Sequence, residues 1–315
     1  MKSVKSKIGL ALGSGAARGW AHIGVIKALE NENIPIHFIS GSSVGSYVGA
    51  VYSGGGFESL KEFALSMDRK KVLSYIDVVF PRSGLLNGKN ATKLYSMHTE
   101  IMGFDELPIP IKMVATDMDT GEKLILDEGN IPESIRASCS IPGIFTPVKM
   151  GNRWVIDGGL IDPVPVSVVK SMGADFVIAV DLNSGVINEQ KKKKKENNNK
   201  PSEQRKAVAK NEIVNQLFSK YDQAGKLMKN KLNSWFNQSE SSPHIINIIG
   251  SAIGIMQAQI TKNNLEIDCP DVLIQPQLAG VKMFDYDQAE RSINEGYDRT
   301  MEKMETITKL LDNHV

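Results

Sequence analysis

The sequence has 315 residues, of which 41% are hydrophobic and 23% charged, so it is long enough for one large α/β domain and excludes a chain that is disordered throughout. The formal net charge of +1 excludes a global attraction to nucleic acid. A partner that is recognised through charge must therefore bind a local segment of the chain. Two isolated cysteines, in no CxxC pattern, exclude a disulfide framework or a structural zinc site and favour a reducing compartment.

The first predicted element is a strand at 8–12 (IGLAL), buried on both faces. Three lysines precede this apolar run, as in a short signal peptide, but glycines break the run and Arg18 follows closely. No stretch approaches the roughly 18 uncharged apolar residues of a transmembrane helix. We therefore expect a cytoplasmic protein, with at most a peripheral contact at the inner face of the membrane.

Strands and helices alternate along the next part of the chain. The hydrophobic pattern predicts a helix at 17–32, a strand at 37–40 and a helix at 44–53. This order predicts an α/β fold whose mostly parallel central sheet is flanked by helices on both faces. Further strands are expected at 111–117, 122–126, 153–156, 175–181 and 271–274, and further helices at 88–101, 131–138, 164–172 and 286–312.

A polar, low-complexity and basic insert occupies 185–243, which leaves 1–184 and 244–315 as one catalytic domain. Within it, 205–236 carries a helical pattern with seven basic and two acidic residues. One interpretation is an amphipathic helix on anionic membrane. The alternative is a helix that packs on the core or on a second subunit, with its lysines in solvent.

The segment GSSVG at 41–45 follows an apolar strand and opens a helical run. A strand–turn–helix junction of the form GxSxG is typical of a nucleophile elbow, in which Gly41 and Gly45 permit the sharp turn that exposes Ser43. The helix that follows favours negative charge at its N-terminus. The alternative is a structural serine that only caps the helix.

The segment GSGAARG at 13–19 also joins a strand to a helix. It lacks the last glycine of a dinucleotide fingerprint and the lysine of a Walker A loop, so nucleotide binding is disfavoured. The backbone amides of Gly15 and Ala16 are the candidates for an oxyanion hole, because small side chains let a substrate oxygen approach. An ordinary tight turn is the alternative. Gly13, Ser14, Arg18 and Gly19 belong to the same motif and are candidates to shape the loop.

The segment DGGLIDPVPV at 157–166 places Asp157 at the end of an apolar strand, before Gly158 and Gly159. A carboxylate at a strand end could reach the serine of a neighbouring strand and act as its general base. The alternative is an Asx turn, which is common where Asp precedes Gly. Asp162 and Asp181 occur near similar turns, and we interpret both as structural.

The five histidines argue against a Ser-His-Asp triad. In the chain order of α/β hydrolases the histidine follows the acid, and only His244 and His314 do so. Neither lies in a predicted strand-end loop. A Ser43–Asp157 dyad therefore fits better, and a triad through His244 remains an alternative.

These segments, together with ASCSIPGIFTPV at 137–148, resemble the bacterial cytoplasmic branch of the patatin-like phospholipase family over about 7–183 and again over about 251–300. The resemblance implies that Ser43 is the nucleophile, Asp157 the dyad aspartate, Gly15 and Ala16 part of the oxyanion loop, and Arg18 its basic residue. The family's glycine run reads SGA here. We expect the oxyanion hole to be retained, because alanine has the same backbone N–H donor as glycine.

The resemblance implies two-step acyl transfer on fatty-acyl esters of lipids, with no metal or cofactor. Asp157 accepts the proton of Ser43, the oxyanion loop holds the tetrahedral intermediate, and water hydrolyses the acyl-enzyme. An alternative of another class is a regulatory or adaptor protein that keeps the fold with little hydrolysis.

Overall fold

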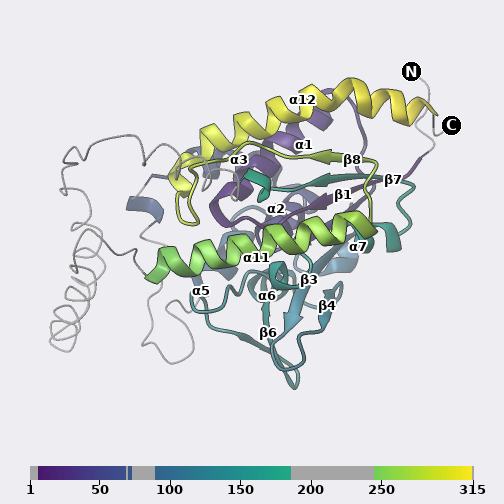
Figure 1. The fold of residues 1–315 in the computed structure, drawn as a ribbon. Coiled ribbons are helices and arrows are strands. Elements are labelled where there is room, and N and C mark those ends of the chain that lie inside the picture. The colour runs from purple at the N-terminus through teal and green to yellow at the C-terminus, as the bar shows by residue number, and fades with distance from the viewer. Residues whose placement is uncertain (1–5, 69, 73–88, 186–244, 314–315) are drawn as a thin grey trace, which may run out of the picture.

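The structure is a computed structural model that describes residues 6–68, 70–72, 89–185 and 245–313 (Figure 1). Apart from Gly185, the insert at 185–243 lies outside the described residues, and so does the basic helix expected at 205–236. The division into a catalytic domain and an insert, and the membrane contact of that helix, therefore stay predictions.

A mixed sheet of eight strands forms the centre of the molecule, with hydrogen-bonded neighbours in the order β5-β6-β3-β2-β1-β7-β8 and with β4 also paired to β3. The five neighbouring strands β3, β2, β1, β7 and β8 run parallel, which confirms the predicted α/β sheet. β4 and β6 each pair antiparallel with β3, and β5 pairs antiparallel with β6. The strands are β1 (Ile8–Leu12), β2 (Phe38–Ser42), β3 (Ile111–Asp117), β4 (Lys123–Leu126), β5 (Val148–Met150), β6 (Arg153–Asp157), β7 (Phe176–Val180) and β8 (Val272–Ile274).

One edge of β3 is shared by two strands that lie end to end. Ser42, the last residue of β2, pairs with Val114, and Asp157, the last residue of β6, pairs with Ala115. The opposite edge of β3 is taken by β4, which pairs with the same two β3 residues. Since one edge of a residue accepts one neighbouring strand, β2 and β6 approach from opposite directions and end at adjacent positions.

Helices cover both faces of the sheet, as the sequence predicts, because alternate residues of each strand point to opposite faces. On β1, Leu10 and Leu12 pack in one core with α1, α2, α3 and α12. Ala11 packs on the other side with α7 and with the end of α11, which crosses the front of the sheet in Figure 1. The helices are α1 (Ala21–Asn31), α2 (Val44–Ser53), α3 (Phe57–Leu65), α5 (Lys89–Ser96), α6 (Ile131–Ser138), α7 (Val166–Ser171), α11 (Ile245–Ile267) and α12 (Ala289–Asn313).

Three elements were not predicted from the sequence: α3, β5 and α11. β5 is joined to β6 by a turn at 151–152, too short for a crossover, so the two strands form an antiparallel hairpin. The helix expected at 88–101 ends at Ser96, and the closing helix starts with a 3₁₀ turn at Tyr286–Gln288 before α12.

Within the described ranges, no helix has both the length and the apolar character needed to span a bilayer.

Candidate active site

Ser43 occupies the sharp turn between β2 and α2. Its backbone is left-handed, with φ 55° and ψ −123°, a conformation that costs a non-glycine residue about 1–3 kcal/mol. The glycines on either side are required by close packing. A Cβ added to Gly45 would lie 2.1 Å from the carbonyl oxygen of Leu12, and one added to Gly41 would lie 2.6 Å from the backbone of Ser46. The segment GSSVG therefore forms the predicted strained elbow.

Asp157 faces this elbow from the end of β6. Its Oδ2 accepts a hydrogen bond of 2.5 Å from Ser43 Oγ, and its Oδ1 accepts one of 2.8 Å from the amide of Gly159. A Cβ on Gly158 would lie 2.1 Å from the carbonyl oxygen of Val114, so only glycine fits beside β3. The end-to-end placement of β2 and β6 on β3 thus brings together the two side chains that the sequence nominates.

Both members of this pair are shielded from solvent, with exposed fractions of 3% for Ser43 and 1% for Asp157. Burial raises the pKa of Asp157 to about 7, because a carboxylate loses hydration, and the hydrogen bonds from Ser43 and Gly159 oppose this shift. A carboxyl group with a pKa near neutrality is a stronger base than an exposed aspartate and still holds a charge at neutral pH.

The loop at 13–19 leaves two of its amides without an acceptor. Gly13 N donates to Val180 O, Ser14 N to Pro163 O and Ala17 N to Met283 O. In the part of the chain that the structure describes, Gly15 N and Ala16 N donate to nothing. These are the two amides that the sequence nominates for an oxyanion hole.

Two side-chain hydrogen bonds and one close packing contact hold the conformation of this loop. Arg18 Nε donates to Gly15 O over 3.2 Å, and His22 Nε2 donates to Gly13 O over 2.7 Å. Burial lowers the pKa of His22 to about 4, so this histidine is a neutral donor. A Cβ on Gly19 would lie 2.2 Å from Val44, which shows how closely the loop packs against the start of α2. Arg18 and His22 therefore support the loop from its inner side.

Ser138, at the end of α6, is a site residue to which the sequence analysis gives no role. Its Oγ accepts from Ser43 N over 3.0 Å, donates to Val114 O over 2.6 Å and lies 2.8 Å from Ser46 Oγ. The hydroxyl thus joins the elbow, α2 and β3. Ser138 belongs to the segment ASCSIPG, so the motif signalled the region, but only the tertiary contacts identify the residue.

The segment after Ser138 also encloses the pair. Ser140 O accepts from Asp157 N over 3.0 Å, and Arg136 braces this stretch through Ser140 Oγ and Thr146. Burial and the nearby Asp157 carboxylate raise the pKa of the Cys139 thiol, which is therefore neutral. Cys139 lies beside Ser43 as an uncharged wall of the site.

No imidazole stands between Ser43 and Asp157 in the described ranges, where the Asp157 carboxylate has only Ser43 and Gly159 as partners. His37 accepts from Ile8 N, and His98 bonds to Tyr47 and Ser59. His244 and His314 lie outside the described residues.

The two other aspartates occupy structural positions. Asp162 Oδ2 forms an ion pair of 3.0 Å with Lys123. Asp181 accepts hydrogen bonds from Asn183 N and from Gln275 Nε2. Neither has a contact with Ser43, in agreement with the interpretation of both as structural.

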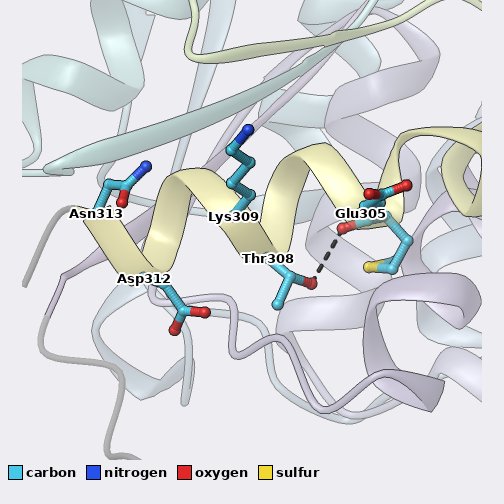
Figure 2. Close-up of a pocket in the computed structure, with 6 residues that line it drawn as sticks. Glu305, Thr308, Lys309, Asp312 and Asn313 are labelled. Atoms are coloured by element: carbon cyan, nitrogen blue, oxygen red, sulfur yellow. Dashed lines mark hydrogen bonds between the residues drawn. The ribbon is translucent and has the colours of Figure 1, made fainter.

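The described part of the chain contains no group of three or more His, Cys, Asp or Glu side chains that could hold a metal ion. A depression of about 550 Å³ lies on one side of α12, far along the chain from the elbow (Figure 2). Its polar side chains are arranged along the surface of one helix, and Thr308 bonds to the carbonyl of Met304 on the same helix. This depression has no part in the arrangement around Ser43.

A family model described as patatin-like phospholipase matches residues 10–170, which include Ser43 and Asp157. An uncharacterized NTE family protein of Mycobacterium tuberculosis is 38% identical over 184 residues, which are 58% of this chain and 50% of the relative. The chain thus matches about half the length of this relative.

The chain also matches two eukaryotic relatives, each over a smaller share of the relative's length. Patatin-like phospholipase domain-containing protein 6 of Homo sapiens is 32% identical over 185 residues, which are 56% of this chain and 13% of that protein. Lysophospholipase NTE1 of Debaryomyces hansenii is 33% identical over 189 residues, 56% of this chain and 12% of that protein. The crystal structure of VipD from Legionella pneumophila superposes with a TM-score of 0.46 at 15% identity, covering 98% of this chain and 67% of that one.

Proposed function

This chain belongs to the patatin-like phospholipase family, and from that premise we propose that it hydrolyses acyl esters of lipids with Ser43 as nucleophile and Asp157 as general base. The observation that carries the proposal is the buried hydrogen bond of 2.5 Å from Ser43 Oγ to Asp157 Oδ2. A serine that only capped a helix would need no such partner, and an aspartate that only closed a turn would not be directed at a strained serine.

In the first half of the reaction, Ser43 Oγ attacks the ester carbonyl carbon while its proton passes to Asp157 Oδ2. The carbonyl oxygen becomes an oxyanion, which the free amides of Gly15 and Ala16 stabilise. One donor of this kind is worth about 2.7–4 kcal/mol in the transition state. Asp157 then protonates the leaving alcohol as the tetrahedral intermediate breaks its ester C–O bond.

In the second half, a water molecule attacks the acyl-Ser43 ester and gives its proton to Asp157. The second tetrahedral intermediate breaks the bond to Ser43 Oγ, which recovers its proton, and a fatty acid leaves. A single carboxyl group serves twice as base and twice as acid, and the pKa of about 7 for Asp157 suits both roles. The backbone strain at Ser43 supports this assignment, since it holds the oxygen toward the carboxylate.

Lipids are the proposed substrates for two reasons. Relatives with related sequences are named as a phospholipase domain-containing protein and as a lysophospholipase. In addition, the segment beside Ser43 leads directly into an apolar cluster of Ile141, Ile144 and Ile253, flanked by Phe145 and Phe284. Side chains of this kind suit an acyl chain next to the reacting ester.

Labelling with a fluorophosphonate probe, followed by peptide mapping, tests the assignment of the nucleophile. We expect the probe to modify wild type at Ser43 and to leave Ser43→Ala unmodified. Ser42→Ala is a matched control, because the neighbouring hydroxyl is buried and has no hydrogen-bond partner among the described residues. Modification at Ser42 or at another serine, with Ser43 unmodified, would refute the assignment.

A further inference from the structure

Helix α11 lies over the candidate active site with its inner face. A Cβ on Gly159, the residue whose amide bonds Asp157, would lie 2.4 Å from Gln257 Nε2. One turn earlier, Ile253 packs against Ile141 and Ile144, in the segment that follows Ser138 and Cys139. The helix therefore spans the turn that carries the base and the loop beside the nucleophile, and Figure 1 shows it across the front of the sheet.

The outer face of the same helix is apolar and exposed. Ile248, Ile255 and Met256 have exposed fractions of 47%, 42% and 47%, and Ala252 is exposed between them. These positions follow a spacing of three and four residues, so they form one stripe on the helix. The stretch 245–261 contains no Asp, Glu, Lys or Arg. A polar surface would normally carry charges over four turns of helix, so this stripe is unlike a solvated face.

Exposed apolar side chains are concentrated on this helix. Among the described residues, nine large hydrophobic side chains are exposed, and four of them, counting Ile267, belong to α11. The other five are distributed over other helices, strands and turns. They are Leu65, Met97, Met118, Ile125 and Trp154. The concentration on α11 indicates a docking surface rather than the scattered exposure that every globular protein shows.

We propose that the outer face of α11, from Ile248 to Met256, docks on a lipid surface and thereby presents the site to lipid acyl esters; this inference rests on the proposed function. A second copy of the chain is a poorer occupant, because stable protein interfaces bury about 800 Å² per partner and this stripe offers three half-exposed large side chains. The width of one apolar helix stripe matches the shallow insertion of interfacial helices.

The charge of the chain that enters α11 favours an anionic lipid surface. Residues 186–244 contain 13 Lys and Arg against six Asp and Glu, a net charge of +7, whereas the whole chain has +1. Basic residues near an apolar stripe add electrostatic attraction to anionic lipid, where they are worth about 1 kcal/mol each close to the surface. Apolar contact from α11 and attraction from this charge thus favour the same partner.

The test compares full-length wild type with Ile255→Gln/Met256→Gln. Binding is measured by flotation with vesicles of phosphatidylcholine and phosphatidylglycerol in equal amounts. Hydrolysis is measured on the same vesicles and, separately, on soluble p-nitrophenyl butyrate. The matched control is Leu65→Gln/Met97→Gln, which replaces two similarly exposed apolar side chains, one on α3 and one in the turn after α5. Light scattering after size exclusion reports the oligomeric state of all three proteins.

We expect the α11 variant to lose about tenfold or more in vesicle partitioning and in vesicle hydrolysis. The reason is that the apolar surface of the two replaced side chains is no longer transferred from water to lipid. Its activity on the soluble ester and that of the control variant should stay within about twofold of wild type. Equal vesicle binding by all three proteins would overturn the inference, and so would a wild-type dimer that the α11 variant converts to monomers. Failure of wild type on the soluble ester would refute the proposed function instead, while vesicle binding would still decide the role of α11.

Discussion

The Ser43 hydroxyl and the Asp157 carboxylate, 114 positions apart in the chain, meet at 2.5 Å because the strands that carry them end at adjacent positions on one edge of β3. β2 runs parallel to β3 and β6 antiparallel, so their last residues converge. The base is therefore placed by backbone hydrogen bonds of the sheet and not by a mobile loop.

The pH dependence of hydrolysis should report the Asp157 carboxyl group. Asp157 must be ionised to accept the proton of Ser43, and burial raises its pKa to about 7. We expect kcat/KM on a soluble ester to be constant above this pH and to fall about tenfold per pH unit below it. A pH series of initial rates, with the Ser43→Ala background subtracted, measures this limb. A profile that stays flat down to pH 5 would contradict the assignment of Asp157 as base.

Replacement of Asp157 by asparagine should abolish activity and stabilise the fold. The native pKa of about 7 exceeds the ordinary value of 3.8, so wild type loses stability as pH rises from about 4 through 7 and the buried group ionises. We expect Asp157→Asn to raise the free energy of unfolding by about 2 kcal/mol or more at pH 8.

This gain should largely disappear toward pH 4, where Asp157 is protonated in the folded state and only partly ionised in the unfolded state. Urea unfolding at pH 8 and pH 4 measures the difference, and Asp119→Asn, at an exposed aspartate, is the control. A destabilised Asp157→Asn at pH 8 would contradict this account of the burial energy.

Removal of the Ser138 hydroxyl should lower turnover. It leaves Ser43 N and Val114 O without their partner, and an unpaired buried polar group costs about 1–3 kcal/mol. We expect Ser138→Ala to reduce kcat about tenfold or more with KM nearly unchanged, since the elbow is displaced and the apolar cluster around Ile141 is not. Steady-state kinetics and urea unfolding together separate a positioning role from a loss of fold.

The matched control for Ser138 is Ser134→Ala, one turn earlier on α6. The Ser134 hydroxyl is buried and has no hydrogen-bond partner in the described part of the chain, so its loss should leave kcat and stability near wild type. If both variants lose the same activity, Ser138 has no particular role in holding Ser43.

Much of this arrangement could be predicted from the sequence, because it depends on local turn chemistry. The glycines of GSSVG and DGGLID signal two sharp strand-end turns, and apolar β1 signals a buried parallel strand. The role of Ser138 could not be predicted, since its three contacts come from the elbow, α2 and β3. Likewise α11 gives little helical signal, because its isoleucines and glycines are weak helix formers and no charged face marks its period.

The left-handed backbone of Ala16 predicts a stabilising substitution. Ala16 has φ 50°, which costs an alanine about 1–2 kcal/mol more than a glycine, and its amide is one of the two free donors. We expect Ala16→Gly to raise the free energy of unfolding by about 1 kcal/mol with hydrolysis retained, as measured by urea unfolding and initial rates. Ala17→Gly, at a buried neighbour whose φ is negative, should destabilise instead. Equal losses in both variants would show that the loop does not hold Ala16 in this conformation.

Hydrolysis of p-nitrophenyl butyrate by purified wild type, Ser43→Ala, Asp157→Asn and Ser42→Ala tests the Ser43–Asp157 dyad most directly. The account predicts turnover by wild type and by Ser42→Ala, and a loss of about a thousandfold or more in each dyad variant while both remain folded by circular dichroism. Turnover by folded Ser43→Ala at the wild-type rate would contradict it. So would a wild type that neither hydrolyses the ester nor reacts with the fluorophosphonate probe, a result that would favour an adaptor protein with this fold.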